Sequence, residues 1–128
     1  MLRLLLVSTL VAMLGISAGC SKHGSDMPDL GTVQGTITLD GKPLAGVSIY
    51  FKPDIGRQSM AQSDAEGKYE AFYLIDEKGV KLGPCTVNVE WGPEGSGPSI
   101  PAKYGSQSEL KFDVKSGKNT FDIPMTSG

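Results

Sequence analysis

The chain of 128 residues is poor in the side chains that carry most enzyme chemistry. It has one histidine, two cysteines and one tryptophan. A catalytic zinc site normally needs several histidine ligands, and Ser-His-Asp or Cys-His catalysis also needs a histidine. His23 lies in a polar stretch near the N-terminus, where a site would not be preorganised. We therefore predict a protein that is not an enzyme and that has no cofactor and no metal site.

Runs of like charge are also missing. Twelve Lys and Arg stand against fourteen Asp and Glu, so the formal net charge is −2. This balance disfavours a nucleic-acid stripe and a polybasic membrane patch. The glycine-rich segment 92–97 is followed by proline rather than by Gly-Lys-Ser/Thr, so it does not match a phosphate-binding loop. We predict no nucleic-acid partner.

The N-terminus has the order of a secretory signal peptide, which we place at residues 1–19. A positive start is followed by the mostly apolar residues 4–16 and the small residues 17–19. The apolar run is shorter than the about 20 residues that span a bilayer. Residues 17–20 also resemble the bacterial lipobox, although Ser17 stands where Leu is usual. This resemblance implies that Cys20 is lipidated; the alternative is cleavage by an ordinary signal peptidase.

Residues 20–30 are polar and aperiodic, and they predict a flexible tether after the lipidated Cys20. The expected localisation is therefore the cell envelope, after export, with a lipid anchor in a membrane. The second cysteine, Cys85, lies within a predicted strand, which indicates a small buried hydrophobic residue. An intramolecular disulfide is disfavoured, whereas the cysteine count leaves an intermolecular one open.

The stretch 31–53 organises the rest of the chain. Two runs of β-forming residues, 33–39 and 47–53, alternate with the period of half-buried strands. Between them Asp40 and Gly41 suit left-handed backbone, and Pro43 fixes φ and lacks an N–H. We predict two antiparallel strands joined by a tight reversal.

Five further segments have the same alternation: 58–63, 68–74, 85–91, 110–115 and 121–126. Turn residues separate them at 54–57, 64–67, 76–79 and 116–119. Pro124 indicates that the last strand is at a sheet edge or ends there. The sequence thus predicts an all-β fold, a seven-stranded antiparallel β-sandwich over residues 31–126.

Two motifs in this region resemble a known family. Residues 35–47, GTITLDGKPLAGV, and residues 63–69, SDAEGKY, are similar to the carboxypeptidase regulatory-like domain, which has a transthyretin-like fold. Residues 81–87 resemble its next strand, with Cys85 in place of the usual aromatic residue. The segment 100–121 is similar to small exported lipoproteins of planctomycete-type bacteria. The resemblance covers nearly all of residues 31–126, and it implies a fold rather than an activity, since the domain accompanies the peptidase and does not perform its hydrolysis.

The motif residues have structural roles in this interpretation. They are Asp40, Gly41, Pro43, Asp64, Gly67 and Tyr69. Asp64 can accept hydrogen bonds from its own turn, Gly67 can take a positive φ, and Tyr69 starts the next strand from the core side. Calcium binding through Asp64 and Glu66 is the alternative, but the twelve-residue loop with Gly at its sixth position is absent.

These features together favour a non-enzymatic, membrane-tethered envelope lipoprotein that acts as a binding or structural module. Its partners would be the membrane, through the lipid anchor, and an envelope protein or a glycan. The alternative is a small carbohydrate- or peptide-binding domain that uses Trp91, Tyr104 and the 92–105 loop as a stacking platform. Alternatively, Trp91 and Tyr104 only cap the open end of the sandwich. A third hypothesis is a hydrolase with no recognisable site.

Overall fold

The computed structural model describes residues 27–93 and 95–127 and is all-β. The part of the chain that it describes has twelve strands and no helix. They are β1 (Leu30–Leu39), β2 (Lys42–Pro43), β3 (Val47–Pro53), β4 (Ser59–Gln62), β5 (Lys68–Glu70), β6 (Phe72–Leu74), β7 (Glu77–Lys78), β8 (Val80–Lys81), β9 (Gly83–Trp91), β10 (Lys111–Val114), β11 (Gly117–Thr120) and β12 (Ile123–Met125). The predicted signal peptide, Cys20 and His23 lie outside the described residues.

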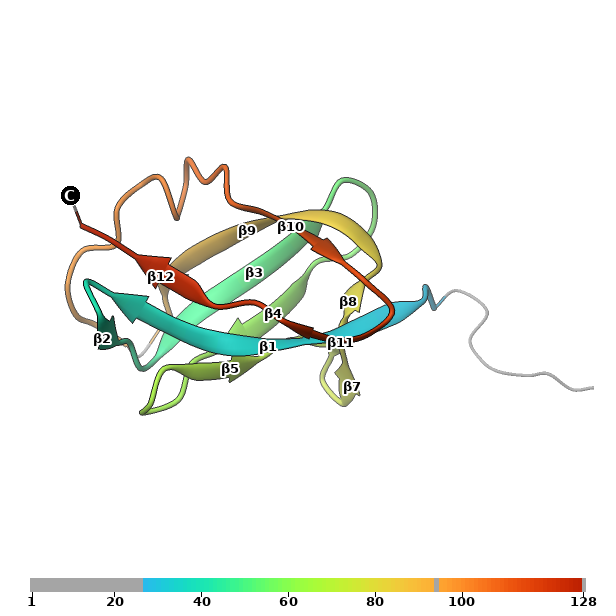
Figure 1. Cartoon of the computed structure of the whole chain (residues 1–128), viewed down its shortest axis with the longest axis horizontal. Helices are drawn as coiled ribbons and strands as arrows, with labels where there is room; N and C mark the ends of the chain where they lie inside the picture. Colours follow the sequence, from blue (N-terminus) through green and yellow to red (C-terminus); the bar gives the residue numbers. More distant parts are fainter. Residues whose placement is uncertain (1–26, 94, 128) are drawn as a thin grey trace, which may run out of the picture.

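Two sheets pack against each other (Figure 1). In the first, the long strand β1 has antiparallel partners β8, β5 and β2 on one side and parallel partners β11 and β12 on the other. The second sheet is antiparallel, in the order β10-β9-β3-β4-β6-β7. The alternation of buried and outward-facing residues places the core between the sheets, which makes a β-sandwich-like domain.

The core follows the predicted alternation. Val47, Ile49 and Phe51 of β3 are buried, and so are Cys85, Val87 and Val89 of the neighbouring strand β9. From the first sheet, Val33 and Ile37 of β1 and Tyr69 of β5 belong to the same cluster, and the rings of Phe51 and Tyr69 lie 6.0 Å apart. The prediction that these strands bury one face is therefore confirmed.

The predicted pairing of 33–39 with 47–53 is wrong. The reversal at Asp40 (φ 53°) and Gly41 (φ 84°) leads only into the two-residue strand β2, which pairs with the end of β1. Pro43 has no N–H to extend that ladder, and Gly46 (φ 79°) then redirects the chain. As a result β3 enters the other sheet, between β4 and β9. Alternation shows which face of a strand is buried, but it does not show which strand lies beside it.

The described residues form twelve strands rather than the predicted seven, and two strand pairs depart from the predicted antiparallel arrangement. Most of the expected turn 116–119 belongs instead to β11, which runs parallel to β1, as does β12. The strands that were not predicted, β2, β7, β8 and β11, are two to four residues long. Three of them pair with successive parts of the ten-residue strand β1, and β7 pairs with β6 in the second sheet. Pro124 lies in β12 at the edge of the first sheet, as predicted.

Gly35 allows this crowded arrangement around β1. A Cβ atom at position 35 would lie 2.0 Å from the carbonyl oxygen of Phe121, where the chain passes from β11 to β12. Such a distance is far inside van der Waals contact. Only glycine permits the C-terminal segment to approach β1 this closely.

Candidate functional site

An open groove of about 1190 Å³ lies along β4, β5 and β6. Its apolar lining includes Met60, Phe72, Leu74 and Ile75. Met60 is 49% exposed and Phe72 is 36% exposed, although both belong to strands. Large exposed apolar side chains that gather on one surface are typical of interaction sites, whereas scattered ones are common on any protein.

The strand register explains why these side chains gather. Met60 lies directly opposite Phe72 across β4 and β6, and opposite Tyr50 across β4 and β3. Side chains directly opposite each other in a sheet share a face, so these three form a row across the outer face of the second sheet. Ala61 next to Met60 is buried, as alternation requires. The groove is thus carried by strands of the sheet rather than by loops alone.

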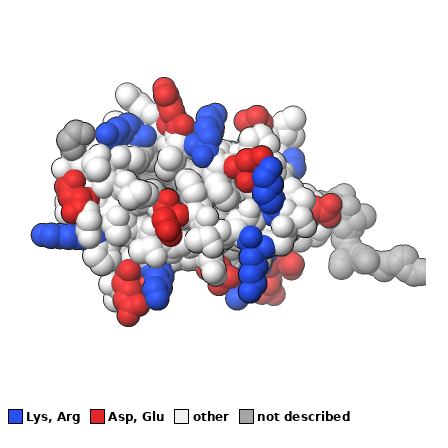
Figure 2. All heavy atoms as spheres, in the orientation of Figure 1, with Lys and Arg blue, Asp and Glu red and all other residues white. Residues whose placement is uncertain are grey.

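The charges around the groove are largely paired or stacked. Lys78 lies 3.4 Å from a carboxylate oxygen of Glu70, and the Arg57 guanidinium lies 5.8 Å from the centre of the Tyr73 ring. Figure 2 shows acidic and basic side chains interspersed over one face of the molecule. The lining of the groove itself holds two basic residues, Arg57 and Lys68, and two acidic ones, Asp64 and Glu70. We therefore expect an occupant that binds mainly through apolar contact.

Asp64 lines the groove, and its carboxylate is hydrogen-bonded to the main chain of its own turn. Its Oδ1 accepts hydrogen bonds from the main-chain N–H groups of Glu66 and Lys68, both at 2.9 Å. These two bonds, that from Lys68 first, hold the pKa of Asp64 below its ordinary value. Gly67 has φ 78°, and a Cβ there would lie 2.6 Å from the carbonyl oxygen of Ile37. The motif thus fastens the β4–β5 turn against β1.

The other turn of the motif, at Asp40 and Gly41, contacts the C-terminal segment. The main-chain N–H of Ser127 donates to Asp40 Oδ1 at 3.0 Å, and the Ser127 hydroxyl donates to Oδ2 at 2.7 Å. The hydroxyl bond is the main cause that lowers the pKa of Asp40. Tyr69, the last motif residue, is buried and donates its hydroxyl to the carbonyl of Phe121. These contacts are intramolecular and structural in kind.

Trp91 is half-buried at the end of β9 and is held by its own loop. Its indole N–H donates to the carbonyl of Pro98 at 2.9 Å. A Cβ at Gly97 would lie 2.5 Å from the ring, so the loop backbone packs closely on the indole. Trp91 also lines a smaller hollow of about 570 Å³, together with Lys52, Asn88 and Glu90.

Tyr104 does not line that hollow with Trp91. Its ring packs on the core, and its hydroxyl oxygen accepts a hydrogen bond from the main-chain N–H of Thr126 at 3.0 Å. Hydrogen bonds to Thr126, the side-chain bond first, lower the pKa of Tyr104. The structure thus places the two predicted platform residues in different surroundings.

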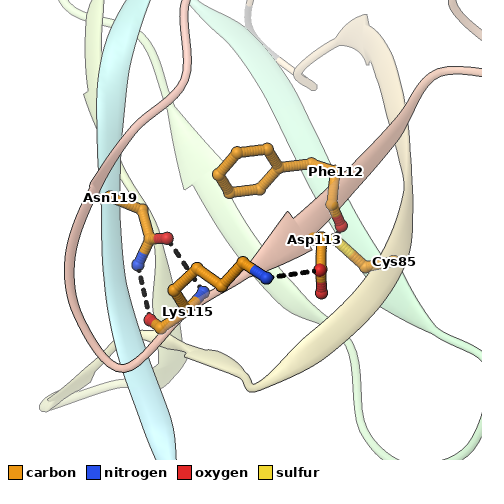
Figure 3. A network of polar contacts seen from close by, with 5 residues as sticks. All are labelled: Cys85, Phe112, Asp113, Lys115 and Asn119. Atoms are coloured by element: carbon orange, nitrogen blue, oxygen red, sulfur yellow. Dashed lines mark hydrogen bonds and ion pairs between the residues drawn. The ribbon is translucent and has the colours of Figure 1, made fainter.

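Cys85 is a buried free thiol (Figure 3). Its Sγ lies 3.3 Å from the carbonyl oxygen of Phe112, to which it can donate. Burial, with a smaller contribution from the Asp113 charge, raises the pKa of Cys85 to about 11. The thiol is therefore protonated at neutral pH, which makes it a poor nucleophile.

Asn119 organises the turn that follows β10 (Figure 3). Its Oδ1 accepts from the Lys115 N–H at 2.9 Å, and its Nδ2 donates to the carbonyls of Lys115 at 2.8 Å and Thr32 at 3.0 Å. Nearby, Lys115 Nζ lies 2.8 Å from Asp113 Oδ2. Asn119 thus joins the β10–β11 turn to β1.

Residues 27–93 and 95–127 contain no group of three His, Cys, Asp or Glu side chains that could hold a metal ion. No helix that is long and apolar enough to cross a membrane occurs in these residues.

A scan against protein-family models found no match to the chain, and searches of curated proteins and of solved structures found no similar protein. The assignment of a site therefore rests on the geometry of the groove and the hollow.

The groove was not predicted from the sequence, although a signal for it exists. The segment 68–74 is apolar on both faces, with Tyr69 and Ala71 on one and Phe72 and Leu74 on the other. A strand with one solvated face should be polar on that face. The apolar residues Phe72 and Leu74 on the second face were therefore the signal of the groove.

Proposed function

We propose that this chain is a non-enzymatic, membrane-tethered lipoprotein of the cell envelope, whose β-sandwich domain binds a protein partner through the groove along β4, β5 and β6. The fold type in this proposal is the transthyretin-like one of carboxypeptidase regulatory-like domains. The motif residues support it, because Asp40, Asp64 and Gly67 form the two turns that the resemblance implies. The lipobox-like residues before Cys20 support the anchor.

The exposed row of Met60 and Phe72, extended by Leu74, carries the proposal. Methionine, aromatic and arginine side chains are enriched in the buried centres of protein interfaces. Here Met60 and Phe72 have Tyr73 and Arg57 beside them in the groove. The strands fix the backbone of Met60 and Phe72, so binding has only side-chain rotamers to order there.

The test is photo-crosslinking in cells with the full chain. A photoreactive amino acid at position 60 is expected to capture one recurrent envelope protein, whereas the same group at the exposed position Lys118 of β11 should not. In a second chain the photoreactive group is placed at position 72. There, Met60→Lys should reduce capture of the partner several-fold, because a charged side chain replaces an apolar one in the groove. Equal capture from positions 60 and 118 would contradict the proposed site.

The anchor has its own readout in the same cells. Mass spectrometry of the N-terminal peptide is expected to show acyl chains on Cys20. More than one chain is needed for stable anchoring, since a single acyl chain binds a membrane only marginally. An unmodified Cys20 would contradict the anchor and leave the groove to be tested in a secreted domain.

A second candidate function is binding of a carbohydrate or a peptide at Trp91. The observation that favours it is the hollow beside Trp91, in which Lys52 and Glu90 supply polar groups and Asn88 Oδ1 has no hydrogen-bond partner within the described residues. The loop that holds the indole makes this candidate secondary, because part of the ring is already covered. A shift of Trp91 fluorescence on addition of soluble glycans or peptides would support it, and an unchanged spectrum across the panel would contradict it.

A further inference from the structure

Two isoleucines at loop tips are the most exposed large apolar side chains of the described residues. Ile55, between β3 and β4, is 78% exposed, and Ile75, between β6 and β7, is 95% exposed. Both lie in turns between strands, where polar residues are usual. Single exposed apolar residues need no explanation, but two at one end of a molecule define a surface.

Both tips lie at the end of the domain where β1 begins, which we call the tether-side end (Figure 1). Leu30 at the start of β1 lies opposite Lys81 of β8, and Lys81 Nζ donates to the carbonyl of Ile55 at 2.7 Å. The β6–β7 hairpin is placed there too, because its strand β7 leads directly into β8. The loops that carry Ile55 and Ile75 therefore lie at the same end of the domain as the start of β1.

The distance from Cys20 to this end is limited by the chain itself. Leu30 lies ten residues beyond Cys20, and ten residues reach at most about 35 Å. With Cys20 anchored in a membrane, Leu30 and the tether-side end stay within about 35 Å of the bilayer. The β1–β2 turn with Lys42 lies at the opposite end (Figure 1).

We infer that the tether-side end docks on the lipid bilayer, with Ile55 and Ile75 inserted at the level of the headgroups. This inference rests on the lipid anchor of the proposed function. Beside the two tips, Tyr73 and Arg57 stack on each other, a pair suited to the interface between headgroups and acyl chains. Docking of this kind orients the domain, so that the groove, which ends at Ile75, opens close to the membrane surface.

The charges of this end indicate how the docking works. The segments 54–58 and 75–81 at this end hold three basic residues, Arg57, Lys78 and Lys81, and three acidic ones, Asp54, Asp76 and Glu77. The surface thus has no excess of positive charge to attract anionic lipids. Apolar insertion is the driving force, so docking on zwitterionic phosphatidylcholine should equal docking on anionic vesicles and should change little with salt.

The experiment uses the full chain, acylated on Cys20 and reconstituted into phosphatidylcholine vesicles. A polarity-sensitive fluorophore is attached through Ile75→Cys, through Ile55→Cys or, as the control, through Lys42→Cys at the far end. The buried Cys85 remains unlabelled. Brominated lipids are expected to quench the fluorophores at positions 55 and 75 several-fold more than the one at position 42.

A second variant separates docking from mere proximity. With the fluorophore at position 55, Ile75→Asn should reduce the quenching several-fold, whereas Ile75→Leu should preserve it. Equal quenching at positions 42, 55 and 75 on an acylated protein would overturn the docking while leaving the anchor and the groove intact. Absence of acyl chains on Cys20 would overturn the anchor itself, and docking with it. Quenching that appears only with anionic lipids would show that charge attraction, not apolar insertion, drives docking, and it would overturn the proposed mechanism.

Discussion

Asp64 shows how one side chain can determine a turn. Its carboxylate Oδ1 replaces a main-chain acceptor for two N–H groups of the same turn. The residue types predict this arrangement, because Asp readily bonds the main chain two residues on and Gly67 takes the positive φ that closes the turn. The interaction is local and so can be predicted from the sequence.

The charge of Asp64 should make the stability of the domain depend on pH. The pKa of Asp64 in the folded state lies below its ordinary value of 3.8. Its contribution to the free energy of unfolding is therefore fully present above 3.8 and is lost as the pH falls through the folded-state pKa. We expect Asp64→Asn to destabilise the domain at neutral pH and to differ progressively less from wild type on acidification.

Urea unfolding followed by Trp91 fluorescence, at a series of pH values on both sides of 3.8, measures this difference. Asp76→Asn, a change of an exposed carboxylate in the β6–β7 turn, is the control and should follow wild type more closely. A stability difference between wild type and Asp64→Asn that stays constant or grows on acidification would be the contrary result.

At the scale of elements, the β10–β11 turn decides how the C-terminal segment meets β1. Residues 116–119 have the composition of a turn, yet 117–120 form a strand. Asn119 causes the difference, because its side chain satisfies the main chain of Lys115 and also reaches the Thr32 carbonyl in β1. That contact joins residues 87 positions apart, so no local pattern announces it.

We expect Asn119→Ala to destabilise the domain by about 1–3 kcal/mol, since it leaves main-chain groups without partners in a nearly buried place. Lys118→Ala, at the exposed neighbouring position, should change the stability by less than about 0.5 kcal/mol. Thermal or urea unfolding of both variants gives the two values. Equal effects of the two exchanges would mean that the side-chain bonds of Asn119 do not hold the turn.

At the scale of the whole molecule, the first sheet depends on the C-terminal segment. Gly31–Gln34 of β1 pair with β11 and Ile37–Leu39 pair with β12. Ile123 and Met125 of β12 are almost completely buried. Each such side chain contributes about 1.5–3 kcal/mol through burial, and a small domain is stable by only about 5–15 kcal/mol in total.

A chain that ends at Val114 is therefore expected not to fold, because β1 loses one whole side and the core loses two large side chains. A chain that ends at Thr126 keeps β11 and β12, loses the bonds of Ser127 to Asp40, and should remain folded. Far-UV circular dichroism and the emission of Trp91 distinguish the two cases. A cooperative unfolding transition in the shorter chain would show that the remaining strands suffice.

The alternation of apolar and polar residues predicted the all-β class and the buried faces of β3 and β9. The turn residues predicted the backbone of the two motif turns. These features depend on neighbours within a few residues. The partners of β1, the parallel pairing of β11 and β12 and the row of Met60 and Phe72 depend instead on contacts between distant segments. A period of two shows which side of a strand is buried, but it does not identify the neighbouring strand. An outward apolar side chain becomes part of a larger apolar surface only when the neighbouring strand places another one beside it.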